Sequence, residues 1–143
     1  MQFAGNEMPV DTNEGMSLGR IVMLLVAKLY SDDVPLPFRN QEPWHQLFFE
    51  LKVDRDIPGK PSFLSYLVFD WDGPYPICRE LSEFLNGLHI TGNVSGHNPR
   101  FDYITMSKRD ADQWLQDYES LDQNSKNFVQ RVVSSAQKEF LAT

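Results

Sequence analysis

Phe69-Asp70-Trp71-Asp72-Gly73-Pro74-Tyr75-Pro76 is the stretch around which the rest of this chain is arranged. An apolar run over residues 63–69 ends there, and a helical pattern begins just beyond it. Gly73 and Pro74 favour a turn, because glycine tolerates unusual backbone angles and proline fixes φ. We therefore expect a structural joint, at which a short strand stops and the chain turns into a helix that starts at Pro76.

The side chains of this joint allow two interpretations. Asp70 and Asp72 point the same way if the chain is extended, and paired carboxylates can hold a metal ion or share acid–base work. Alternatively, Asp72 caps the following helix and Asp70 is simply solvated. We favour the second interpretation because no third ligand stands nearby in the sequence. Trp71 and Tyr75 are then expected to anchor the joint against neighbouring helices.

Before the joint, the sequence predicts two helices and a short strand. Ser17 can cap a helix whose apolar residues, 21–27, cover nearly every side, which is typical of a central core helix. The next helix tolerates Pro43 in its first turn and carries one apolar stripe, formed by Trp44, Leu47, Phe48 and Leu51. Residues 63–69 favour a short strand, with a helical turn over 62–66 as the alternative.

After the joint, apolar residues at helical spacing predict a helix over 76–87, with a stripe of Ile77, Leu81, Phe84, Leu85 and Leu88. Two β-forming runs around a tip rich in Gly, Asn and Pro predict a β-hairpin over 89–105. Ser107 is expected to cap a fourth helix, and the capping-box pattern of Ser120 and Gln123 to begin a fifth. This last helix, 121–141, carries an apolar stripe of Phe128, Val129, Val132, Val133, Ala136 and Phe140.

This order of elements indicates the fold class α+β: a mostly helical, winged-helix-like domain with a short strand and a β-hairpin wing. The 143 residues are enough for one domain with its own core. The first fifteen residues are polar and rich in turn formers. We therefore expect a flexible N-terminal tail over residues 1–15 and a single domain over residues 16–143.

The joint and the leucines after it, Leu81, Leu85 and Leu88, resemble the signature of the YwgA-like family of small bacterial and archaeal proteins. That signature reads Tyr-x-Tyr-Gly-Pro-Tyr-Ser, and here Trp71 replaces a tyrosine and Pro76 the serine. Panacea-type antitoxin domains carry a looser version, and in both families a hairpin ends in a segment similar to 103–105 of this chain. The resemblance implies a winged-helix variant, and its looser branch implies an antitoxin role. It implies no catalytic residues.

The formal charge of −7 and the single cysteine narrow the function classes. A chain this acidic is repelled by nucleic acid and by anionic lipid unless a local basic patch intervenes. With Cys78 alone, neither an intrachain disulfide nor a multi-cysteine zinc site can form, and a reducing cytoplasm is the expected compartment. The longest apolar stretch, residues 21–27, is far shorter than the roughly 20 residues that cross a bilayer, so we expect no membrane span.

The sequence predicts no catalytic, cofactor-binding or metal-binding constellation. His45, His89 and His97 show no helical metal spacing, and no Gly-rich phosphate loop occurs. Cys78 could act as a nucleophile with a histidine only in an exposed, electropositive site. Its place beside Ile77 favours a buried small hydrophobic residue instead.

DNA binding is the alternative that the winged-helix order suggests. The helix over 76–87 would enter the major groove, and the wing over 89–105 would contact phosphate. Four basic residues are the candidate contacts: Arg79, Arg100, Lys108 and Arg109. Carboxylates neighbour these residues in the sequence, so the charge disfavours a transcriptional regulator that binds DNA.

The sequence therefore predicts a non-enzymatic interaction or regulatory module that binds another protein or a second copy of itself. An antitoxin-like role is the form that the looser resemblance implies. The helix over 121–141 is the candidate dimer contact, since its apolar stripe can pack across two chains. The same stripe can also pack inside one chain, and the two arrangements are not exclusive.

Overall fold

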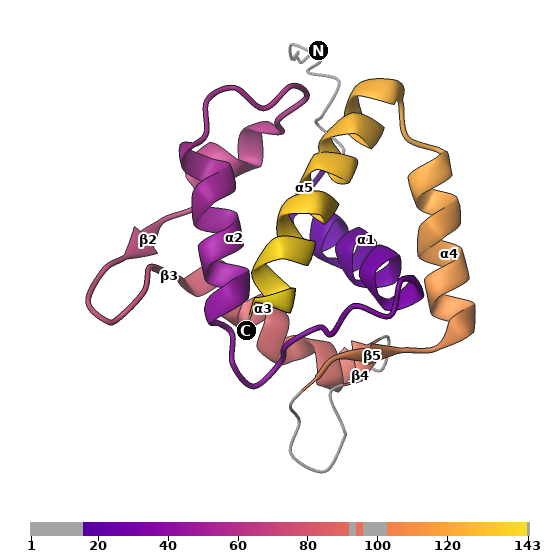
Figure 1. The fold of residues 1–143 in the computed structure, drawn as a ribbon, viewed down its shortest axis with the longest axis horizontal. Coiled ribbons are helices and arrows are strands. Elements are labelled where there is room, and N and C mark those ends of the chain that lie inside the picture. The colour runs from indigo at the N-terminus through magenta and orange to yellow at the C-terminus, as the bar shows by residue number, and fades with distance from the viewer. Residues whose placement is uncertain (1–15, 92–93, 96–102, 143) are drawn as a thin grey trace, which may run out of the picture.

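The computed structural model describes residues 16–91, 94–95 and 103–142 (Figure 1). The elements in chain order are α1 (Leu18–Ser31), α2 (Glu42–Val53), the 3-10 helix η1 (Ser62–Tyr66), β2 (Phe69–Asp70), β3 (Ile77–Cys78), α3 (Arg79–Thr91), β4 (Val94–Ser95), β5 (Thr105–Met106), α4 (Lys108–Glu119) and α5 (Gln123–Leu141). The described chain is mostly helical and carries two separate antiparallel strand pairs, β2–β3 and β4–β5. The α+β class is thereby confirmed.

Helix α1 is the centre of the fold, as its apolar sequence predicts. The Ser17 hydroxyl accepts a hydrogen bond from the Arg20 amide at 3.2 Å, so the predicted cap is present. Every residue from 21 to 27 is buried, and α4 and α5 both pack on α1 (Figure 1). Helices α2 and α5 also pack against each other, which completes a helical core around α1.

Helix α2 presents its predicted stripe to α5. The stripe is buried throughout and consists of Trp44, Leu47, Phe48 and Leu51. Pro43 occupies the first turn, as expected. The Trp44 ring lies 4.7 Å from the Phe140 ring of α5, and its indole N–H donates to the Pro37 carbonyl at 2.6 Å. Trp44 therefore joins α2, α5 and the loop that precedes α2.

The apolar run before the joint is only partly the predicted strand. Residues Ser62–Tyr66 form η1, the alternative that the sequence leaves open, and the strand β2 is two residues long. Leu64 and Leu67 are buried while Tyr66 is exposed. This three-residue period suits a 3-10 turn, in which residues i and i+3 lie on one face, and it does not suit the alternation of a strand.

The joint is a β-hairpin of its own, which corrects the prediction of a strand that turns directly into a helix. Strand β2 pairs with β3, Phe69 opposite Cys78, and α3 begins only at Arg79. Asp72 is therefore in the exposed turn of a hairpin and caps no helix. Strand β3 cannot be predicted from the local sequence, because its position depends on a contact with α2. The Cys78 amide donates a hydrogen bond to His45 Nδ1 at 3.0 Å.

The two strands predicted around residues 89–105 are present as the antiparallel pair β4–β5. Its first strand begins later than predicted, because residues 89–91 continue helix α3. Extending a formed helix adds one hydrogen bond per residue, and this outweighs the β preference of Ile90 and Thr91. The predicted tip of this hairpin, including residues 96–102 with His97 and Arg100, lies outside the described residues.

Helix α5 is capped two residues later than the sequence predicts. Asp122, and not Ser120, is the N-cap, because its carboxylate accepts from the Ser125 amide at 2.7 Å. Ser120 instead ends α4, where its hydroxyl donates to the Asp117 carbonyl at 2.6 Å. A carboxylate caps as well as a hydroxyl and also favours the positive end of the helix dipole, so Asp122 takes the position.

The apolar stripe of α5 is buried inside the chain. All six predicted members are buried: Phe128, Val129, Val132, Val133, Ala136 and Phe140. Helix α5 packs on α1 and α2. The surface over 121–141 that the sequence offers for a dimer contact is therefore used for intramolecular packing, and Leu141 is the large apolar side chain that stays exposed on this helix.

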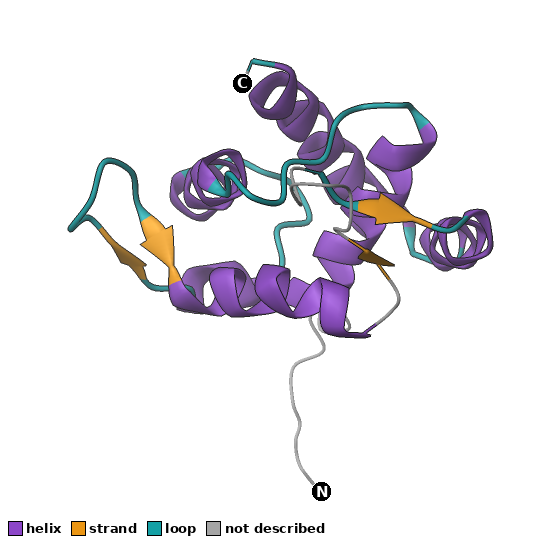
Figure 2. Ribbon diagram, turned by 90° about the horizontal axis from the view of Figure 1, so that it is seen from below, coloured by secondary structure: helices purple, strands orange, loops and turns teal. Residues whose placement is uncertain are grey.

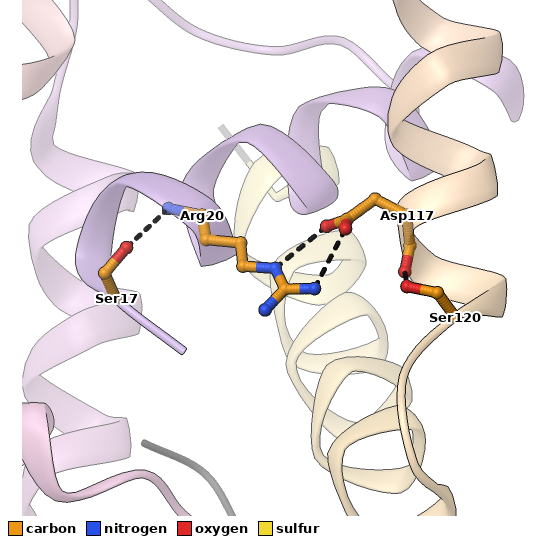
Figure 3. A network of polar contacts seen from close by, with 4 residues as sticks. All are labelled: Ser17, Arg20, Asp117 and Ser120. Atoms are coloured by element: carbon orange, nitrogen blue, oxygen red, sulfur yellow. Dashed lines mark hydrogen bonds and ion pairs between the residues drawn. The ribbon is translucent and has the colours of Figure 1, made fainter. Parts of the chain in front are cut away.

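An ion pair ties the start of α1 to α4 (Figure 3). The Arg20 guanidinium contacts both carboxylate oxygens of Asp117, each at 2.9 Å. The two side chains are 28% and 31% exposed, so solvent screens the pair. A pair of this kind contributes about 1 kcal/mol or less. Its main effect is to fix how the two helices approach each other.

Candidate functional site

Exposed apolar side chains concentrate on the β2–β3 hairpin and just before it. In the described part of the chain, eight large hydrophobic side chains are exposed, and four of them lie within residues 66–77. These four are Tyr66, Val68, Trp71 and Ile77, with exposed fractions of 78%, 61%, 60% and 37%. We call them the hairpin surface. Exposed apolar groups gathered in one segment are typical of a site that another molecule covers.

Aromatic contacts hold the hairpin against α2. The Phe49 ring of α2 makes edge-on contacts with the rings of Phe69 and Trp71, at 5.4 and 5.3 Å between ring centroids. The Tyr75 ring lies 5.9 Å from the His45 ring of the same helix. Trp71 and Tyr75 thus anchor the hairpin, as predicted. Trp71 nevertheless keeps 60% of its surface exposed.

The strand register places apolar groups on both faces of this hairpin. Asp70 is paired with Ile77, so their side chains share one face, and Phe69 lies on the other face with Phe49. The β2–β3 pair projects from the helical body (Figures 1 and 2). The hairpin therefore presents apolar groups on both faces of a projecting strand pair.

Two carboxylates accompany the apolar groups. Asp70 and Asp72 are both exposed, and residues 66–78 contain no basic side chain. The hairpin therefore carries a local negative charge. Over the ranges that the structure describes, no group of three or more His, Cys, Asp and Glu side chains is placed to hold a metal ion.

A serine–histidine pair lies where the hairpin meets α2, and its hydrogen bonds exclude base catalysis. The buried His45 has Nε2 at 3.1 Å from the Ser82 hydroxyl, a distance at which a histidine can activate a serine. His45 Nδ1, however, accepts from the Cys78 amide, so the neutral ring carries its proton on Nε2. Nε2 then donates to the serine and cannot take its proton. The pair is structural and holds β3 and α3 to α2.

Cys78 is buried, as its neighbours in the sequence predict, although it lies in β3 and not on the helix. Its thiol donates to the Glu80 carboxylate at 3.3 Å. Burial raises the pKa of the Cys78 thiol, and the Glu80 carboxylate raises it further. The group therefore stays a thiol at neutral pH, which is the opposite of what a nucleophilic cysteine needs.

The fold is expected to lose stability as the pH falls below about 6.5, the ordinary pKa of histidine. Burial lowers the pKa of His45 in the folded chain. The unfolded chain then binds a proton that the folded chain does not, so unfolding becomes easier in acid. The stability that His45 contributes is complete above about pH 6.5 and is lost as the pH falls through the lowered pKa.

Urea unfolding near neutral pH and near pH 5 measures this effect, with His45→Gln as the matched variant. The glutamine does not titrate, and its side chain can still accept from the Cys78 amide. The wild type should lose more unfolding free energy between the two pH values than the variant loses. Equal losses would mean that other groups set the acid sensitivity.

The structure separates the candidate nucleic-acid contacts. Arg79 is the first residue of α3, whereas Lys108 and Arg109 begin α4, next to β5. The 13 residues of α3, about 20 Å of helix, lie between the two places, with one strand pair at each end (Figure 2). Lys108 is in addition paired with Asp112 at 3.3 Å. The structure thus brings Lys108 and Arg109 together and leaves Arg79 apart from them.

The exposed face of α3 is acidic over its described side chains. Arg79, Glu80, Glu83 and Asn86 are exposed there, so one cation stands beside two carboxylates. The Asn86 side-chain carbonyl accepts from the Gln41 amide group at 2.8 Å. An amide that could read a base edge is therefore already engaged, and the face lacks the positive charge that phosphate contacts need.

Comparisons with protein-family models, with curated proteins and with solved structures find no match for this chain. Among the helices that the structure describes, none is both long and apolar enough to cross a bilayer. The hairpin surface, with its aromatic anchor and its two carboxylates, is the feature on which a function can be proposed.

Proposed function

We propose that the protein is a non-enzymatic interaction module that binds another protein through the hairpin surface. One observation supports this above all: half of the large exposed apolar side chains of the described chain lie on one projecting hairpin or within the few residues just before it. Trp71 is the expected centre of the contact, because tryptophan is the residue type that most often dominates binding energy at protein interfaces.

The anchoring of Trp71 supports the same proposal. Its edge-on contact with Phe49 restrains the indole ring before any partner arrives. A restrained side chain loses less conformational freedom on binding, so more of the contact energy appears as affinity. Asp70 and Asp72 would then orient the partner and select one with a basic rim. A hairpin that fills the groove of a partner would also block that groove, which is one way for an antitoxin-like regulator to inhibit its target.

The order of α3 followed by the strand pair β4–β5 supports assigning the domain to the winged-helix type. In that assignment α3 takes the place of the helix before the wing. The hairpin β2–β3 then stands at the opposite end of α3 from the wing (Figure 2). The proposed protein-binding surface at one end of α3 is therefore separate from the wing at the other end.

Site-directed photocrosslinking tests the proposed interface. A photoreactive phenylalanine analogue at residue 71 should form an adduct with a protein from an extract of the source cells. The same analogue at residue 103, which is 52% exposed on another surface, is the matched control and should give no such adduct. Equal labelling from both positions, or none from residue 71, would contradict the proposal.

DNA binding is the second candidate, and the exposed pair Lys108 and Arg109 beside the wing favours it. A fluorescence-anisotropy titration on a random duplex separates the two candidates. The interaction module should bind weakly at physiological salt. Tight binding that falls steeply with salt and is lost in the Lys108→Glu, Arg109→Glu double variant would establish the nucleic-acid alternative.

A further inference from the structure

A cavity of about 390 Å³ lies between α1, α3 and α4, away from the hairpin surface. Its lining comes from three helices and comprises Gly19, Met23, Glu83, Phe84, Gly87, Leu88 and Trp114. Cavities of roughly 300–1,000 Å³ hold small organic ligands, and such sites combine apolar walls with a few polar groups. This cavity has both features.

Two half-buried aromatic side chains, Phe84 and Trp114, form part of its walls. The Phe84 ring packs closely on α1 at Gly19. A Cβ added at Gly19 would stand 3.0 Å from this ring. Trp114 has no ring contact and no hydrogen bond to its indole N–H among the described residues. Part of the Trp114 ring packs against the core, and the exposed part of the ring and the N–H donor are available to a bound molecule.

Gly87 keeps part of this cavity open at a cost in helix stability. It lies inside helix α3, where glycine is less favourable than alanine by about 1 kcal/mol. A Cβ at this position would meet no atom within 4 Å, so packing does not require a glycine. The backbone does not require one either, since its φ is not in the left-handed region. A side chain at position 87 would instead occupy the space of the cavity.

Glu83 is exposed and supplies the negative charge at the edge of the cavity. It is the single charged residue among the described lining residues, and no described residue forms an ion pair with it. A carboxylate beside aromatic ring faces attracts a cation, because the rings also carry negative charge on their faces. No basic side chain of the described lining competes for Glu83.

We propose that this cavity binds a small organic cation with an apolar body. The ammonium group of the ligand pairs with Glu83, and the apolar body packs between Phe84 and Trp114 over the gap that Gly87 leaves. This site stands apart from the hairpin surface and does not depend on the function proposed for it.

Two-dimensional amide NMR with three matched probes tests the site on the full chain. The probes are phenethylammonium, its neutral analogue 2-phenylethanol, and the anion 3-phenylpropionate. Phenethylammonium should shift the amide signals of Gly19 and Gly87 and the indole signal of Trp114. It should also bind at least about fivefold more tightly than the anion, and Glu83→Gln should remove that preference.

Gly87→Leu fills the cavity and should abolish the shifts, while the raised helix propensity keeps the chain folded. Gly73→Leu is the matched control, because a Cβ at Gly73 also meets nothing within 4 Å but stands on the hairpin. Its binding should equal that of the wild type. Shifts elsewhere, equal binding of cation and anion, or unchanged binding by the Gly87→Leu variant would each overturn the proposal.

Discussion

Replacing Trp44 with alanine is expected to lower the free energy of unfolding by about 3–5 kcal/mol. The Trp44 side chain is fully buried, packs on Phe140 and bonds the Pro37 carbonyl through its indole N–H. The substitution leaves a cavity between α2 and α5 and also strips a buried carbonyl of its donor. Since a domain is stable by only about 5–15 kcal/mol, this loss takes a large part of the total.

Urea unfolding of Trp44→Ala and Trp71→Ala measures the difference between a core and a surface tryptophan. Trp71→Ala should cost about 1 kcal/mol or less, since the side chain is mostly exposed and loses one aromatic contact. Trp44→Phe, which keeps a ring but loses the indole N–H, should fall between the two and remain folded. Similar losses for Trp44→Ala and Trp71→Ala would contradict the account of the core.

Gly59→Ala is expected to destabilise the chain by about 2 kcal/mol or more. Gly59 has a φ of 75°, a conformation that side chains other than glycine adopt only with strain. A Cβ there would stand 2.6 Å from the Asn124 backbone carbonyl oxygen, at the start of α5. Because the obstacle is backbone, the loop before η1 and the first turn of α5 must move apart.

Gly87→Ala is the control for this second effect, measured by the same urea unfolding. Its position is helical and meets nothing within 4 Å, so alanine should raise the free energy of unfolding by about 0.5–1 kcal/mol. The two glycine substitutions are therefore expected to act with opposite sign. If Gly59→Ala left the free energy of unfolding unchanged, the loop would pack on α5 less tightly than the structure shows.

The helices could be predicted from the sequence where local chemistry decides them. Ser17 and Ser107 begin their helices as capping residues, and the apolar period of α1, α2 and α5 identifies the side chains that form the core. These signals act within a few residues, so no tertiary information is needed to recognise them. Ser120 shows the limit, because Asp122 offers an equally good cap two residues later.

The β2–β3 hairpin could not be predicted in the same way. Its second strand is held by a hydrogen bond from the Cys78 amide to His45, a residue 33 positions earlier on another helix. Only the packing of α2 brings these groups together. The same residues, read locally, fit a helix start, since Gly73 and Pro74 precede an apolar period of helical spacing.

The candidate site was partly visible in the sequence. The sequence singles out three residues of the site, namely Asp70, Trp71 and Asp72. Their exposure could not be predicted, because it depends on which face of the hairpin Phe49 covers. Tyr66 and Val68 lie in an apolar run that reads as core. The turn of η1 between Leu64 and Leu67 is what rotates these side chains outward.

The affinity of Trp71→Ala for the crosslinked partner, measured by titration calorimetry beside Tyr103→Ala, is the decisive measurement for the hairpin surface. Trp71→Ala should bind at least about 30-fold more weakly than the wild type, the loss expected of an interface hot spot of about 2 kcal/mol. Tyr103→Ala should bind as the wild type does, and the fold of both variants should be intact by circular dichroism. Unchanged affinity of a folded Trp71→Ala variant would contradict the assignment of this hairpin as the binding site.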